Sequence, residues 1–104
     1  MKLEDADQVI LEEYGRRAIL AIAQEECAEL IKACSKFNRA CGFGLRTETS
    51  YNEALSDLVE EIADAEHCIR LLKRAFKIDV GVIEDIIEDK ANRTLLRRQM
   101  MKSK

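Results

Sequence analysis

Two short segments of the sequence concentrate carboxylates at helical spacing. Residues 23–30 read AQEECAEL and hold Glu25, Glu26 and Glu29, and residues 59–67, which read VEEIADAEH, repeat the acidic crowding. Like charges three or four residues apart on a helix cost roughly 0.2–0.5 kcal/mol per pair. A hard divalent cation would offset this repulsion, and ligation by oxygen alone favours Mg2+, Mn2+ or Ca2+ over Zn2+. The two segments therefore predict a metal site.

Helical phase separates the acids that can face inward from those that face solvent. In the first segment, Glu26 and Glu29 share a line with Ile22 at the border of an apolar stripe. Glu25 instead lies on a line that leads to Lys36. Glu26 and Glu29 are therefore the candidate metal ligands of this helix.

The second segment divides its acids in the same way. Glu61 and Asp64 share a line with the apolar Leu71, so they are expected at the edge of the core. Glu60 belongs to a fully polar face that continues to His67, and it is expected to be solvated. Glu61 and Asp64 are therefore the ligands that this helix can contribute.

The turn between the two helices brings these acids to one height. In an antiparallel pair, residues at one level have a constant sum of sequence numbers, and Glu29 with Glu61 has the same sum as Glu26 with Asp64. The midpoint of both pairs falls inside the loop at 42–50. Within each helix, the spacing of three residues separates the two acids by about 4.5 Å along the axis. Four carboxylates, two from each helix, are thus expected at one site.

The apolar pattern that positions these acids is helical. Residues 4–14 and 16–41 form two helical segments that meet at Gly15, and the sequence CGFGLRTETS then interrupts the pattern as the main loop. Ser50 and Glu53 have the spacing of a capping box, which predicts the start of the next helix. These segments form the hairpin that holds the acids.

The rest of the chain continues as helix. The apolar stripe that follows Ser50 comprises Leu58, Ile62, Ala65, Ile69, Leu72 and Phe76. After a turn at 77–79, Asp79 is the expected N-cap of a last helix. The inward stripe of this last helix is expected to comprise Val80, Ile83, Ile87, Ala91 and Leu95. With no strand pattern or repeat, residues 1–104 are predicted to form one all-α domain, an antiparallel helical bundle.

Three main helices leave such a bundle incomplete. The last helix also carries Val82 and Ile86 outside its main stripe, which implies a further surface to cover. We therefore expect a homodimer or a larger homo-oligomer to complete the bundle.

Composition narrows the possible partners and locations. The 104 residues carry a formal net charge of -3, and no apolar run approaches the length of a membrane span. The acidic start, MKLEDADQ, does not resemble a secretory signal, so a cytoplasmic location without membrane association is expected. The segment at 90–104 holds six basic residues and no acidic one. Cations favour a helix C-terminus, and in the absence of a recognisable motif we do not expect nucleic-acid binding.

The cysteines do not indicate a metal site or a disulfide. The four cysteines form no CxxC pair, and Cys27, Cys34 and Cys41 recur every seven residues along one helix. This spacing is too long for mutual disulfides or a shared metal. We expect them to be small residues of the core or of its edge.

With these residues placed, the sequence resembles the MazG-like family of all-α nucleoside triphosphate pyrophosphohydrolases. The family signature, EExxE followed by ExxD, stands here as EECAE at 25–29 and EIAD at 61–64. The similarity runs from about Gln24 through Arg97 and includes KFNR after the first motif and EDKANR near the end. The order, separation and helical setting of the motifs carry the resemblance.

The resemblance implies hydrolysis of a (d)NTP to a (d)NMP and pyrophosphate by metal-activated attack of water on the α phosphorus. Mg2+ is the expected cofactor and Mn2+ a possible substitute. By the same resemblance the metal ligands are Glu26, Glu29, Glu61 and Asp64, and the protein assembles as a homodimer or homotetramer.

Further roles are assigned more loosely. Glu25, next to the ligands, is the candidate catalytic residue that positions the attacking water. Lys36, Lys90 and Arg93 are the candidates for binding the triphosphate, although basic residues are also common near helix C-termini. The sequence has no tryptophan, and its candidates for stacking on the base are Tyr14, Phe37, Phe43 and Tyr51.

Three other hypotheses about the function stay open. The acidic motifs would also suit a phosphoribosyl-ATP pyrophosphohydrolase of the same superfamily. Asp64 and His67 have the spacing of the Glu-x-x-His element in dinuclear iron bundles, although His67 is the single histidine and is expected on a polar face. A non-catalytic helical interaction protein, with its acids on the surface, is the third.

Overall fold

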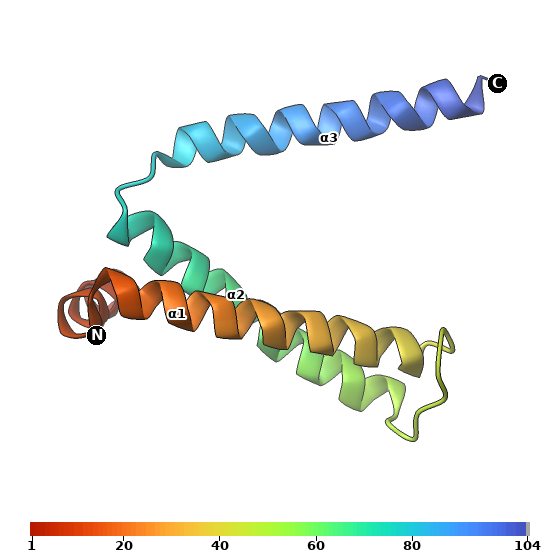
Figure 1. Cartoon of the computed structure of the whole chain (residues 1–104), viewed down its shortest axis with the longest axis horizontal. Helices are drawn as coiled ribbons and strands as arrows, with labels where there is room; N and C mark the ends of the chain where they lie inside the picture. Colours follow the sequence, from red (N-terminus) through yellow and green to blue (C-terminus); the bar gives the residue numbers. More distant parts are fainter. Residues whose placement is uncertain (104) are drawn as a thin grey trace.

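The computed structural model describes residues 1–103, and within them the chain is helical without any strand. The helices are α1 (Leu3–Ala40), α2 (Tyr51–Ala75) and α3 (Val80–Lys102). Figure 1 shows α1 and α2 as an antiparallel hairpin, with α3 held apart from it. The prediction of an all-α fold is confirmed.

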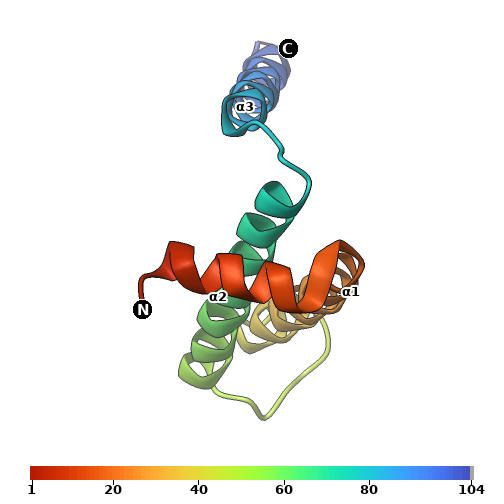
Figure 2. The same cartoon turned by 90° about the vertical axis from the view of Figure 1, so that its left-hand side faces the viewer.

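Gly15 divides α1 into two straight parts. Its backbone angles, φ 79° and ψ 168°, lie in a region that is essentially restricted to glycine. The part before it, residues 3–14, is called the arm here, and it crosses over α2 (Figure 2). The part after it, residues 16–40, runs along α2. The expected break at Gly15 is confirmed.

Small side chains form much of the interface between α1 and α2. The buried apolar residues are Ile19, Ala23, Ala33, Ala54, Ala65, Cys68, Leu71 and Ala75. Because most of these side chains are short, the two helix backbones can approach each other closely. This close approach sets how near the side chains at the edge of the interface come to one another.

Both expected N-caps are present. The Ser50 hydroxyl accepts a hydrogen bond from the Glu53 amide at 3.2 Å and starts α2. The Asp79 carboxylate accepts from the Gly81 amide at 2.7 Å and starts α3. Each bond satisfies an amide that lacks a partner within its helix.

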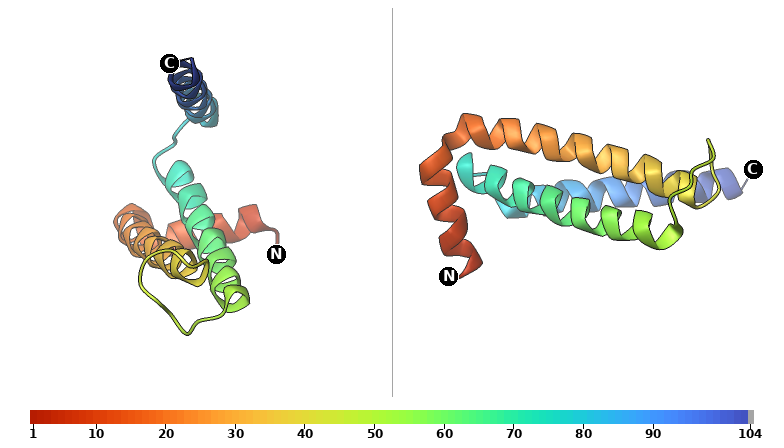
Figure 3. Two further views of the ribbon diagram at one scale, coloured as in Figure 1. Left: turned by 90° about the vertical axis from the view of Figure 1, so that its right-hand side faces the viewer. Right: turned by 90° about the horizontal axis from the view of Figure 1, so that it is seen from below.

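The third helix does not complete the bundle within one chain. No residue of α3 is buried, and Figure 1 shows it separated from the hairpin. Figure 3 shows that it runs back along the length of the hairpin without joining it. The expectation that its apolar stripe packs inward is therefore wrong for the single chain. The radius of gyration is 17.8 Å, whereas a compact domain of this length has about 13 Å. Periodicity defines which face of a helix is apolar, but it does not define what covers that face.

Two further predictions concern the burial of the cysteines and membrane-spanning helices. Cys68 is buried, whereas Cys27, Cys34 and Cys41 are exposed, so the expectation that the cysteines lie in the core or at its edge holds for Cys68 alone. None of the helices within residues 1–103 offers a stretch long and apolar enough to cross a lipid bilayer.

Candidate metal centre

Three carboxylates converge where α1 packs against α2. Glu26 comes from α1, and Glu61 and Asp64 come from successive turns of α2. One carboxylate oxygen of each lies within 4.8 Å of those of the other two. The spacing of three residues places Glu61 and Asp64 on the same face of α2, and the antiparallel hairpin brings Glu26 to their height. This grouping agrees with the height argument made from the sequence.

Glu61 is the least solvated member of this carboxylate triad. Its Oε2 atom is shielded from solvent and has no hydrogen-bond partner among the described residues. Loss of water around the carboxyl raises the pKa of Glu61, and the neighbouring negative charges, first that of Asp64 and then that of Glu26, raise it further. A buried acceptor without a partner is costly. A proton or a cation would satisfy it.

A divalent cation fits this donor set. The triad offers oxygen ligands only, which suits Mg2+ or Mn2+. A cation would also supply the partner that Glu61 Oε2 lacks and would reduce the mutual repulsion of the three acids. Glu26, Glu61 and Asp64 are therefore the residues that could hold a metal.

Glu29 lies at the margin of the triad. Its Oε1 accepts a hydrogen bond from Lys32 Nζ at 3.3 Å, and both side chains are exposed. Its charge still contributes to the raised pKa of Glu61. Exposed ion pairs of this kind are worth little, so the bond to Lys32 holds Glu29 only weakly. The structure thus groups three of the four expected ligands and leaves the fourth beside them.

Two other candidates from the same helix do not join the triad. Glu25 is exposed on α1. Lys36 donates a hydrogen bond to Asp57 Oδ2 at 2.7 Å and links α1 to the first turns of α2. Lys36 is ten residues beyond Glu26, which corresponds to about 15 Å along the helix. Its charge is therefore engaged in the hairpin, away from the carboxylates.

The remaining phosphate-binding candidates lie on the third helix. Lys90 and Arg93 are exposed on α3, which buries no residue. Arg93 lines a shallow hollow together with Asp89, Asn92 and Leu96, all from α3 itself. The structure of the single chain does not bring Lys90 or Arg93 to the carboxylates.

The stacking candidates are divided between packing and exposure. The Phe37 and Tyr51 rings pack against each other, with their centroids 5.1 Å apart and their planes at 53°. Tyr14 and Phe43 are exposed. None of the four is contributed by the turns that carry the triad.

Sequence reasoning missed a buried charge at the other end of the hairpin. Asp7, on the arm, is only 2% exposed. Its Oδ1 lies 2.7 Å from His67 Nε2, and its Oδ2 accepts hydrogen bonds from Arg70 at 3.3 and 3.4 Å. His67 and Arg70 belong to the polar face of α2 that also carries Glu60. Glu60 is exposed, as expected, whereas the arm crosses the C-terminal part of this face.

The ion cluster keeps Asp7 charged. Burial alone would raise the pKa of Asp7, but the hydrogen bonds and positive charges of His67 and Arg70 together outweigh it and lower the pKa. An ionised carboxylate can only accept, so Nε2 of His67 is the protonated nitrogen. Nε2 of His67 is thus engaged by Asp7. No sequence pattern marked Asp7, because its partners lie sixty residues away.

Comparisons with known proteins add no relative. The sequence matches no protein-family model, and neither the curated proteins nor the solved structures contain a significant match.

Proposed function

We propose that this chain is a Mg2+-dependent nucleoside triphosphate pyrophosphohydrolase, which converts a (d)NTP to a (d)NMP and pyrophosphate. The single observation that supports it most is the shielded Oε2 of Glu61, which has no hydrogen-bond partner within the described chain and sits in a cluster of three acids. The resemblance of EECAE and EIAD to the MazG-like signature supplies the reaction.

The chain's own groups have distinct proposed tasks. Glu26, Glu61 and Asp64 hold the cation, for which Mn2+ could substitute, and Glu29 joins them by leaving Lys32. When bound, the cation would neutralise phosphate charge and lower the pKa of the attacking water. Glu25, exposed beside Glu26, orients that water through its carboxylate.

We also propose that the active form is a homodimer or homotetramer. The extended shape and the unburied α3 support this, because most of the large apolar side chains of α3 are exposed. Within one chain Lys90 and Arg93 lie away from the carboxylates. In an oligomer, α3 of the partner could bring these cations to the triphosphate. Lys36 would have to release Asp57 before it could bind the triphosphate.

A second candidate is a non-catalytic helical interaction protein. It is favoured by one specific observation, the absence of any buried residue on α3. In that case α3 would be a docking helix and the three acids would be surface groups. The catalytic proposal differs from it by requiring turnover that depends on Glu61.

The decisive experiment is pyrophosphate release from a panel of canonical and modified (d)NTPs and phosphoribosyl-ATP with Mg2+. Glu61→Gln is expected to abolish release while the helical content stays unchanged. Glu66→Gln, an exposed acid on the same helix, is the matched control and should retain full activity. If the unaltered protein releases no pyrophosphate from any substrate, the enzymatic proposal fails.

A further inference from the structure

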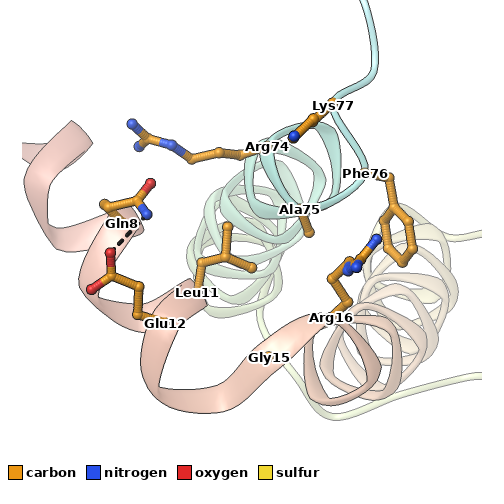
Figure 4. A pocket seen from close by; sticks show the side chains of 9 residues that line it. All are labelled: Gln8, Leu11, Glu12, Gly15, Arg16, Arg74, Ala75, Phe76 and Lys77. Atoms are coloured by element: carbon orange, nitrogen blue, oxygen red, sulfur yellow. Dashed lines mark hydrogen bonds between the residues drawn. The ribbon is translucent and has the colours of Figure 1, made fainter.

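A hollow of about 550 Å³ lies in the angle between the arm and the end of the hairpin (Figure 4). This kink hollow, as it is called here, is within the usual size range of small-molecule sites, about 300–1,000 Å³. The side chains that matter for its chemistry are Leu11, Glu12, Arg16, Arg74, Phe76 and Lys77. They come from the arm, from the start of the 16–40 part of α1 and from the end of α2.

The kink hollow carries an excess of positive charge. Arg16, Arg74 and Lys77 line it, against a single carboxylate, that of Glu12. Among residues 1–103, none of these three cations forms an ion pair. The ion pairs of this part of the chain are made by Lys32, Lys36, His67 and Arg70. Arg74 donates to a neutral group, the Glu4 carbonyl, at 2.7 Å. Two positive charges therefore remain without compensation around the hollow.

An aromatic wall stands beside these charges. Phe76 is 40% exposed, and the Arg16 guanidinium lies over one face of its ring, 5.9 Å from the centroid. Figure 4 shows these two side chains next to each other on one side of the hollow. A ligand that combines a planar ring with an anionic group would find a complementary surface for each part.

The kink hollow is formed without any ligand. The buried contacts of Asp7 with His67 and Arg70 fix the arm on α2, and Arg74 adds a bond to the arm backbone. Gly15 provides the bend at the base of the hollow. A preformed site loses little entropy on binding.

We propose that the kink hollow binds an aromatic phosphate monoester of mononucleotide size, with the phosphate held by Arg16 and Lys77 and the ring against Phe76. This site is distinct from the carboxylate triad. Arg16 is ten residues from Glu26, about 15 Å along α1. Without a cation the triad repels phosphate, whereas the kink hollow attracts it. The proposal does not depend on hydrolytic activity.

The test is a titration of the full chain in EDTA with three probes: inorganic phosphate, AMP and adenosine. Calorimetry gives the affinity, and amide chemical shifts locate the site. AMP is expected to bind most tightly, inorganic phosphate more weakly, and adenosine not measurably. Arg16→Gln and Lys77→Gln should each weaken AMP binding about tenfold, since each removes a charge-assisted hydrogen bond.

Arg17→Gln is the matched control, because Arg17 is exposed next to Arg16 but does not line the hollow. It should leave AMP affinity unchanged. Thermal unfolding checks that each variant is folded. If Arg16→Gln does not fold, Lys77→Gln provides the test by itself, since Lys77 lies beyond the end of α2. Absence of saturable AMP binding would overturn the proposal. So would equal affinities for AMP and adenosine, or an equal loss in Arg17→Gln and Lys77→Gln.

Discussion

Asp7 Oδ1 lies 2.7 Å from Nε2 of His67, sixty residues further along the chain. This contact fixes the arm across α2 and closes the end of the hairpin opposite the loop. Asp7 is also the most deeply buried charged residue of the described chain. Its substitution therefore measures how much this contact stabilises the fold.

Replacing Asp7 by Asn should destabilise the protein by about 1–3 kcal/mol, because His67 and Arg70 lose their charged acceptor. Urea denaturation measures the loss. Asp5→Asn, exposed on the same arm, is the control and should be nearly neutral. Because folding lowers the pKa of Asp7, its contribution is present above its unfolded pKa, about 3.9, and is lost as the pH falls through the lower folded value. Equal stability of Asp7→Asn and the unaltered protein at pH 7 would refute this.

The pH dependence due to Glu61 should have the opposite sign. Folding raises the pKa of Glu61, so its contribution favours the folded state below its unfolded pKa, about 4.3, and is lost as the pH rises through the higher folded value. In EDTA, Glu61→Gln should therefore be more stable than the unaltered protein at pH 7, and the difference should vanish at low pH. Thermal unfolding across this pH range measures it. A Glu61→Gln variant that is less stable at pH 7 would contradict the account.

Substitution of a triad residue should weaken metal binding more than substitution of Glu29 does. Mg2+ or Mn2+ should raise the melting temperature, and Asp64→Asn should remove most of this effect. Glu29→Gln should remove less of it, because Glu29 is bonded to Lys32 at the margin of the cluster. Calorimetric titration with Mn2+ gives the affinities. Equal losses in Glu29→Gln and Asp64→Asn would contradict this ranking and would make Glu29 as strong a ligand as Asp64.

The bend at Gly15 should tolerate no side chain. Nothing lies within 4 Å of a Cβ built there, so the cost of Gly15→Ala comes from the backbone conformation alone. That cost is about 1–3 kcal/mol. Denaturation measures it, and the His67 ring resonances report whether the arm has left α2. Tyr14→Ala, adjacent and exposed, should leave both unchanged.

Self-association should depend on α3. Sedimentation is expected to show a dimer or tetramer, and Ile87→Glu should shift it toward the monomer, because Ile87 is 54% exposed in the single chain. Gln99→Glu, the control, places the same charge at a polar position of the same helix and should leave the oligomeric state unchanged. A monomeric unaltered protein would contradict the proposed assembly.

The sequence by itself determined the helices, their caps, the break at Gly15 and the identity of the acids. These features depend on local backbone preferences and on helical phase, which neighbouring residues specify. The pairing of Glu26 with Glu61 and Asp64 was also predictable, because the position of the loop along the chain sets which residues of an antiparallel hairpin lie at one height.

Only the tertiary structure decided where the arm docks, which acids lose their water and what α3 contacts. Asp7 reaches His67 and Arg70 because the bend at Gly15 aims the arm across α2, and no local pattern encodes that direction. Glu61 differs from Glu29 because the packing of one helix against another shields one carboxyl and leaves the other at the margin. The apolar stripe of α3 is evident in the sequence, yet none of its residues is buried within residues 1–103. Periodicity specifies the face of a helix, whereas its partner is selected by contacts between segments far apart in the chain.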